Sequence, residues 1–295
     1  MSNFLQLVFL GAVWGASFLF MRVAAIPLGP AVLIEGRVLS AAIVLSLIGL
    51  YWRKNLNLMR HPKHFLILGV VNTGLPFLLF AYAAQTLNVS TLAILNSTAP
   101  IWSAIIGAVW YKTRLSLSVI VGLILGICGV VILVGWDAIK LGSNAILPII
   151  AGAGAAFCYG VATNYASHAP KIEAYSNAHG NMWAAAILVL PVIAFLPAAG
   201  PVDANIVIAV LMLGILCTAI AYLIYFNLVA QIGPSSTLSV TFLIPVFGIL
   251  WGNLFLGEPV GLNTLFGGTL VIIGTMYVTG FSPKMLLKRK TAQPN

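Results

Sequence analysis

The chain has 295 residues, of which 61% are hydrophobic and only 6% are charged, and its mean hydropathy is +1.08. Soluble domains carry about 25% charged residues, so this composition excludes a soluble globular protein and indicates an integral membrane protein. The net charge of +9 comes from short basic clusters between apolar runs, which is typical of loop charges that orient a membrane protein rather than of a nucleic-acid-binding surface.

The N-terminal stretch MSNFLQLVFLGAVWGASFLFMRVAA is apolar enough to be mistaken for a secretion signal. It lacks a positively charged start, and its apolar run exceeds the usual ~7–15 residues, so we expect it to be retained as the first membrane span. A helix that crosses ~30 Å of hydrocarbon needs about 20 apolar residues. Ten segments meet this requirement: 4–24, 31–51, 64–84, 90–110, 117–135, 145–166, 176–197, 205–229, 235–256 and 262–280.

A repeat runs through these segments. The stretch VSTLAILNSTAPIWSAIIG at 89–107 returns in outline, 145 positions later, as PSSTLSVTFLIPVFGILWG at 234–252. The same offset relates residues in other spans: Trp14-Gly15 to Tyr159-Gly160, Gly122 to Gly267, Leu125 to Leu270 and Gly129 to Gly274. A constant offset across several helices indicates duplication. We therefore predict an all-α membrane protein with two five-helix repeats, residues 1–140 and 141–295.

Loop charges predict the orientation of these spans. One set of connections and the C-terminal tail hold most of the basic residues: Arg53, Lys54, Arg60, Lys63, Lys112, Arg114, Lys171, Lys284, Lys288, Arg289 and Lys290. The opposite loops hold mainly Asp137, Lys140, Asp203 and Glu258. By the positive-inside rule, both termini are cytoplasmic. Because five spans is an odd number, the second repeat inserts inverted, an arrangement that usually encloses a binding site near the bilayer midplane.

Several residues carry a resemblance to a known family: Trp14-Gly15, Arg37, Pro100, Pro245 and Gly257-Glu258, together with the glycine-rich fifth and tenth spans. Nearly the whole chain resembles the EamA-domain branch of the drug/metabolite transporter (DMT) superfamily, and within it the bacterial exporters of aromatic and other apolar amino acids (the YddG type). The resemblance implies the EamA/DMT fold, outward transport and this substrate class. Where the second half has Gly257-Glu258 the first has Lys112-Thr113, a difference that we interpret as membrane topology.

The fourth span has the most informative pattern. Four residues follow helical spacing along one face: Thr91, Leu95, Thr98 and Trp102. Pro100 removes a backbone donor, and a freed carbonyl in lipid is tolerated only against protein or a water-filled cavity. We expect this kinked face to point inward, although the hydroxyls can equally bond to their own helix. Pro245 predicts a matching kink in the ninth span, and the paired kinks are either gates or fixed packing bends.

Glu35 and Arg37 are the most distinctive charges within the predicted spans. They are two residues apart and so point in different directions on a helix. We expect Glu35 to pair with Arg22 across the short outer loop. Arg37 lies deeper, where it can either bind carbonyls at helix ends or receive a substrate carboxylate through a bidentate contact.

An apolar pocket with aromatic walls and a few polar groups suits a small ligand with an apolar side chain. The candidate substrate-binding residues are Trp14, Ser17, Arg37, Tyr82, Asn96, Thr98, Trp102, Tyr159, Thr163, His179, Trp183 and Tyr225, and the candidate hinges are Pro100 and Pro245. Asn72 and Tyr222 are further polar candidates. For any single aromatic residue, packing or a place in the interfacial belt remains the alternative.

The fifth and tenth spans carry glycines that permit close helix contact, so they either pack the halves together or form a dimer contact. Three cysteines, Cys128, Cys158 and Cys217, lie in apolar runs without metal-ligand spacing and are interpreted as small buried apolar residues. We expect no catalytic residues, no metal site and no cofactor.

The sequence therefore predicts a secondary transporter, multi-pass in the inner (plasma) membrane, that exports aromatic and other apolar amino acids by alternating access. The alternatives are a broader metabolite or drug exporter and, from other classes, a channel or a membrane enzyme. There is no Walker-type loop, HExxH or GxSxG in the chain. Glu35 and His179, both expected toward the outer face, are the only candidates for proton coupling, so we expect passive transport or weak coupling. Amino acids and membrane lipid are the expected partners, and the protein is expected to be a monomer or a homodimer.

Overall fold

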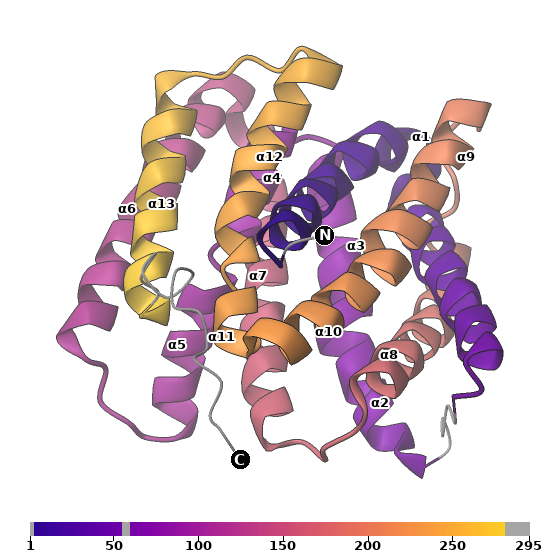
Figure 1. Ribbon diagram of the computed structural model, residues 1–295. Helices are drawn as coiled ribbons and strands as arrows, with labels where there is room; N and C mark the ends of the chain where they lie inside the picture. Colours follow the sequence, from indigo (N-terminus) through magenta and orange to yellow (C-terminus); the bar gives the residue numbers. More distant parts are fainter. Residues whose placement is uncertain (1–2, 55–59, 281–295) are drawn as a thin grey trace.

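The computed structural model describes residues 3–54 and 60–280, and of residues 134–143 and 234–235 only the backbone. Every element in this part of the chain is helical (Figure 1), as predicted. The basic tail expected at Lys284, Lys288, Arg289 and Lys290 and the side chains of Asp137 and Lys140 lie outside the described residues.

The first element, α1 (Asn3–Tyr51), contains two spans. At 49 residues it would be about 70 Å long, more than twice the ~30 Å of hydrocarbon. A kink divides it at Gly29, where φ is 67° and ψ is 166°, a conformation that glycine adopts without steric cost. The prolines Pro27 and Pro30 flank this turn. The predicted spans 4–24 and 31–51 are thus two arms of one bent helix, and we call them the first and second arms.

The remaining eight spans follow in chain order, with several of them interrupted. They are α2 (Pro62–Leu68), η2 (Gly69–Gly74) and α3 (Leu75–Ala84); α4 (Val89–Asn96) and α5 (Ala99–Trp110); α6 (Leu117–Leu141); η3 (Gly142–Ala145) and α7 (Ile146–His168); α8 (Ala174–Val189) and η4 (Leu190–Ala194); α9 (Ala204–Leu211), η5 (Met212–Ile220) and α10 (Ala221–Ile232); α11 (Pro234–Thr237) and α12 (Val240–Leu256); and α13 (Leu262–Thr279). Seven helical stretches are long and apolar enough to cross a membrane, and Leu117–Leu133 and Val240–Leu256 are shorter apolar helices. Since α1 crosses twice, the described residues supply the ten predicted spans.

The fifth and tenth spans show that the repeat is reciprocal in space. A Cβ at Gly122 would lie 2.5 Å from the carbonyl oxygen of Gly274, and a Cβ at Gly129 would lie 2.6 Å from that of Gly267. The 145-residue offset relates Gly122 to Gly267 and Gly129 to Gly274. It therefore converts the contact between Gly122 and Gly274 into the contact between Gly267 and Gly129, as a two-fold relation between the halves requires. α6 and α13 therefore pack the two halves together, side by side at one edge of the molecule (Figure 1).

A second pair of contacts is exchanged in the same way. A Cβ at Gly15 would lie 2.7 Å from Cβ of Phe247 on α12, and a Cβ at Gly160 would lie 2.9 Å from Cβ of Trp102 on α5. Gly15 corresponds to Gly160, and Trp102 to Phe247. The chain therefore folds as two inverted five-helix repeats whose corresponding helices make corresponding contacts.

The two proline-containing spans break at different places, which corrects the prediction of matching kinks. In the fourth span α4 ends at Asn96 and α5 begins at Ala99, so Pro100 lies in the first turn of a new helix, where no hydrogen bond is lost. In the ninth span the break comes earlier in the repeat, before Val240, and Pro245 lies inside α12. Pro245 therefore lies within a helix, whereas Pro100 lies at the start of one.

Glu258, whose presence in the second half alone we interpreted as membrane topology, also connects the two halves. Both of its carboxylate oxygens accept hydrogen bonds from the backbone N–H of Val89, at 2.9 and 3.1 Å. Val89 is the first residue of α4, where N–H groups lack intrahelical partners, and Asn88 caps the same terminus by accepting from the N–H of Thr91. The end of α12 is thereby tied to the start of α4.

Candidate functional site

A cavity of about 570 Å³ lies between the two halves, within the size range of small-molecule sites. The first half contributes residues from α1, η2, α3, α4 and α5, and the second from α7, η5, α10, α12 and α13. The lining residues are Trp14, Ser17, Phe18, Met21, Arg37, Asn72, Phe77, Phe80, Asn96, Ala99, Pro100, Ser103, Ala104, Tyr159, Thr163, Cys217, Tyr222, Tyr225, Leu238, Val240, Thr241, Ile244, Val278 and Thr279.

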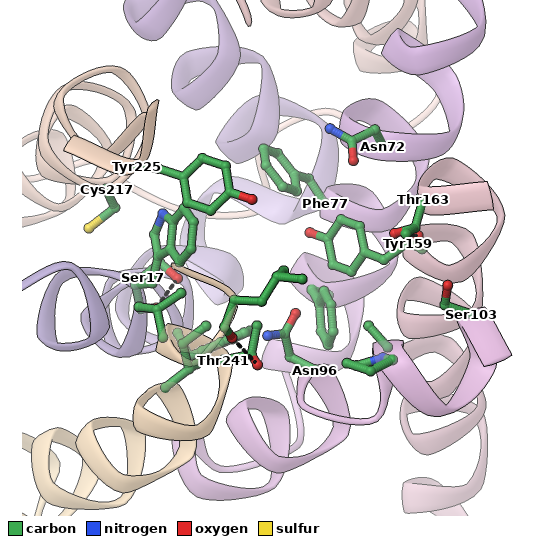
Figure 2. Close-up of a pocket in the computed structure, with 18 of the residues that line it drawn as sticks. Ser17, Asn72, Phe77, Asn96, Ser103, Tyr159, Thr163, Cys217, Tyr225 and Thr241 are labelled. Atoms are coloured by element: carbon green, nitrogen blue, oxygen red, sulfur yellow. Dashed lines mark hydrogen bonds between the residues drawn. The ribbon is translucent and has the colours of Figure 1, made fainter. Parts of the chain in front are cut away.

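Aromatic side chains form two walls of this cavity. The rings of Trp14 and Tyr225 have centroids 5.5 Å apart on one side, and those of Phe80 and Tyr159 lie 6.2 Å apart on the other. Figure 2 shows the hydroxyls of Tyr159 and Tyr225 pointing toward one another across the space. An apolar or aromatic ligand body would contact ring faces from both halves of the chain.

Ser17 and Thr163 differ from Asn96 in the hydrogen bonds that they can offer a ligand. Ser17 Oγ donates to the carbonyl oxygen of Trp14 at 2.6 Å, and Thr163 Oγ1 donates to that of Tyr159 at 2.8 Å. Their protons are therefore used within their own helices, the alternative that the sequence left open. Asn96, the last residue of α4, turns its amide toward the cavity (Figure 2). It lies at the helix break, where ordinary backbone pairing is interrupted.

Arg37 is the charged residue of the cavity lining. It is only 5% exposed, and its Nε donates a hydrogen bond to Oγ1 of Thr218 at 3.0 Å. The guanidinium carbon lies 3.6 Å from the centroid of the Phe77 ring, which forms a cation–π contact. Nη1 is buried without a hydrogen-bond partner among the described residues. The structure thus leaves part of a buried guanidinium available to a molecule in the cavity.

The predicted pairing of Glu35 with Arg22 is wrong. Arg22 Nη1 instead donates to the carbonyl oxygens of Ala84 and Gln85, at 2.8 Å each, where α3 ends. Those carbonyls lack intrahelical partners and need a donor in lipid. Glu35 is buried, and its Oε2 has no hydrogen-bond partner in the part of the chain that the structure describes.

Three of the predicted binding residues from spans three and four lie outside the cavity lining. Trp102, expected to face inward, packs against Gly160 and lies edge-on to Phe157 at 5.6 Å. Thr98 Oγ1 bonds to the carbonyl of Leu95 in its own chain segment, and Tyr82 is 40% exposed on α3. A neighbouring face of the fourth span lines the cavity instead, with Asn96, Pro100 and Ser103.

His179 and Trp183 share one helical face, as their spacing predicted, but they form a separate cluster outside the lining. Trp183 Nε1 donates to Ser46 Oγ at 3.0 Å, and Ser46 lies 2.9 Å from His179 Nε2. Ser46 is near the end of the second arm of α1, eleven positions beyond Glu35. The expectation that Glu35 and His179 lie toward one membrane face is therefore wrong, because Glu35 and the Ser46 that contacts His179 are separated by about 16 Å of helix, roughly half of the ~30 Å hydrocarbon.

Sequence reasoning missed a stripe on the first arm of α1. Phe18 and Met21 line the cavity together with the predicted Trp14 and Ser17. The spacing of three to four residues places all four on one helical face, so the signal was present in the sequence. Phe77, Phe80, Ile244 and Val278 gave no such signal, because their apolar side chains resemble those that face lipid.

A cavity of ligand size, enclosed by two inverted helical halves in a membrane protein, is the architecture of a membrane transporter. The family model confirms this class. The chain belongs to the EamA-like transporter family, which matches residues 3–135 and again residues 146–280.

Relatives are similar over almost their whole length. The Bacillus subtilis (strain 168) protein described as uncharacterized transporter YoaV is 23% identical over 270 residues, 89% of this chain and 91% of the relative. An uncharacterized transporter of Archaeoglobus fulgidus is 24% identical and covers 94% of this chain and 99% of its own. A protein of known crystal structure superimposes with a TM-score of 0.65 at 18% identity, over 94% of this chain and 96% of that one, and so shows the shared fold.

Proposed function

We propose that this transporter carries aromatic and other apolar amino acids outward across the inner membrane. The observation that supports this best is the cavity itself, whose walls are aromatic rings from both halves and whose lining includes one buried arginine. A ring-lined space favours an apolar side chain, and a guanidinium favours a carboxylate. The resemblance to exporters supports the outward direction, and the basic loops support cytoplasmic termini.

Alternating access is supported by the reciprocal construction of the halves. The cavity is bounded by interrupted helices: α4 and α5 in the first half, and α11 and α12 in the second. In inverted-repeat transporters, one half rocks against the other around a fixed central site. The hinge candidates are then the break after Asn96, with Pro100, and the break before Val240, followed by Pro245.

Passive, gradient-following transport fits the ionisable residues better than strong proton coupling. Glu35 lies near the start of the second arm of α1, His179 on α8 contacts Ser46 toward its other end, and neither lines the cavity. A proton relay needs ionisable groups that communicate with the substrate site. A cationic drug would also lack an anionic partner, since the described lining residues include no Asp or Glu.

The test is uptake into proteoliposomes of labelled phenylalanine, tryptophan, methionine, threonine, lysine, glutamate and a cationic dye, with and without a pH gradient. Saturable uptake of the apolar amino acids without a requirement for the gradient is the expected result. Uptake of the dye alone would reject this function in favour of drug efflux.

Two tyrosines provide a matched pair for locating the site. Tyr159→Phe removes a hydroxyl that points into the cavity, whereas Tyr82→Phe removes one from a residue outside the lining. A ligand-facing hydrogen bond contributes ~0.5–1.5 kcal/mol, so Tyr159→Phe should raise KM roughly two- to tenfold while Tyr82→Phe leaves KM unchanged. The reverse pattern would place the substrate site elsewhere.

A further inference from the structure

The guanidinium of Arg37 has most of its hydrogen-bonding capacity unused. Arginine carries five N–H donors, and within the described part of the chain only the donor on Nε has an acceptor, Oγ1 of Thr218. Nη1 is shielded from solvent without an acceptor. Because an arginine stays charged in proteins, these donors can bind an anion or another acceptor that enters the cavity.

The surroundings of Arg37 hold the cation in place without neutralising it. The Phe77 ring covers one face of the guanidinium, and Tyr159, Cys217 and Tyr222 line the same cavity. None of these groups is an anion at neutral pH by its ordinary chemistry. A buried, unpaired charge is costly, so a carboxylate that entered the cavity would supply the missing counter-charge and two acceptor oxygens at once.

The ammonium group of an amino acid meets a different environment. The described residues that line the cavity include no carboxylate, so an ammonium would find only neutral acceptors such as the amide oxygens of Asn72 and Asn96. An ammonium that donates to these amides gains no opposite charge, whereas a carboxylate on Arg37 gains both hydrogen bonds and a counter-charge. The two charged groups of a zwitterionic substrate are therefore recognised unequally.

We propose that Arg37 is the specificity-determining residue of the cavity, that it binds the carboxylate of the substrate, and that the ammonium is dispensable. The substrate class is then apolar and aromatic monocarboxylates, of which the apolar amino acids are one subset. This inference rests on the proposed transport through the cavity. Thr218 is a positioning residue: its hydroxyl holds Nε, and it in turn donates to the carbonyl of Leu213 at 2.9 Å.

The first experiment uses the unaltered protein, purified in detergent, and three ligands that share one ring. L-phenylalanine has both charged groups, 3-phenylpropionate lacks the ammonium, and phenethylamine lacks the carboxylate. Binding is measured by calorimetry and by competition against labelled phenylalanine. We expect phenylalanine and 3-phenylpropionate to bind within a few-fold of each other and phenethylamine not to compete at a tenfold higher concentration.

The second experiment removes the charge. Arg37→Gln should weaken the binding of both carboxylates by roughly ten- to a hundredfold without creating affinity for phenethylamine. Arg53→Gln is the matched control, because it removes the same charge from an exposed residue beyond the end of α1 and should change nothing. A variant is used only if it elutes as a single folded species. If Arg37→Gln does not fold, the ligand series on the unaltered protein still tests the proposal.

The outcomes separate this inference from the proposed function. Competition by phenethylamine equal to that of 3-phenylpropionate, or unchanged phenylalanine binding to folded Arg37→Gln, overturns the carboxylate subsite while amino-acid transport stands. Saturable binding and uptake of 3-phenylpropionate without any amino acid overturns the proposed function and supports the subsite. Absence of binding by all three ligands overturns both.

Discussion

Arg37 in the first half and Met182 in the second occupy corresponding positions of the two repeats, and their surroundings are built alike. Arg37 lies on the second arm of α1, which packs against η5, and Met182 lies on α8, which packs against η2. Each π-helical segment supplies a glycine that permits close approach: a Cβ at Gly214 would lie 2.7 Å from the carbonyl oxygen of Arg37, and a Cβ at Gly69 would lie 2.7 Å from Cβ of Ala184.

Both repeats have a threonine at the corresponding position, but its hydroxyl makes different contacts in the two sites. Thr218 accepts from Arg37, whereas the corresponding Thr73 is fully buried with no hydrogen-bond partner for its Oγ1 among the described residues. Met182 is fully buried and apolar. A close approach of the two elements thus forms with a charge on one side and without one on the other. Packing therefore does not require the arginine, which favours a role in the cavity.

The largest expected effect concerns the contact that both halves share. Gly274→Ala would bring a Cβ within 2.6 Å of the carbonyl oxygen of Gly122, a backbone atom that cannot turn aside. Overpacking of this kind costs roughly 3 kcal/mol and should appear as a lower Tm in detergent. The corresponding Gly129→Ala should cost a similar amount. Gly154→Ala is the control, since its Cβ would meet only Leu79 at 3.6 Å, and equal Tm values for all three variants would refute the two-fold contact.

The next prediction concerns a substitution that removes the difference between the halves at Arg37 and Met182. Arg37→Met copies the second-half residue, and loss of the substrate contact should cost about 2 kcal/mol of binding. Stability should be unchanged or higher, because an apolar residue replaces a buried charge. Binding affinity and Tm are measured on one preparation. A marked fall in Tm with unaltered affinity per folded molecule would make Arg37 a structural residue.

A threonine pair sharpens the same comparison with a smaller change. Thr218→Val leaves Arg37 Nε without its acceptor and should weaken carboxylate binding by about 1 kcal/mol. Thr73→Val removes a hydroxyl that has no partner, so it should raise Tm slightly and leave transport unchanged. Equal effects of the two substitutions on binding would contradict the positioning role of Thr218.

The smallest effect lies at the tie between α12 and α4. Glu258→Gln should lower stability by about 0.5–1 kcal/mol, because a carboxylate at a helix N-terminus interacts with its dipole and N–H groups. The corresponding positions in the other half are Thr113 and Pro234. Thr113→Glu should not stabilise the protein, because proline has no N–H to donate. Thermal unfolding measures both variants, and a gain from Thr113→Glu would show that the tie does not depend on that N–H.

Part of the candidate site followed from spacing and part did not. Trp14, Ser17, Tyr159, Thr163 and Tyr225 were predicted and line the cavity together. The predicted stripe that ends at Trp102 does not, because the adjacent face of the same span lines the cavity: Asn96, Pro100 and Ser103 also follow helical spacing. The choice between two adjacent faces depends on how the span packs against its neighbours, which helical spacing alone does not decide.

The sequence by itself determined the membrane class, the ten spans, the duplication and the residues that permit close helix contact. These follow from composition and spacing because lipid demands apolar helices of a set length and a repeat preserves its contacts. Only the tertiary structure decided which polar groups meet. Arg37 donates a hydrogen bond to Thr218, 181 positions later in the chain, and Arg22 donates to the carbonyls at the end of α3 rather than pairing with Glu35. Such pairings depend on how distant helices cross and where each one breaks, which local periodicity does not record.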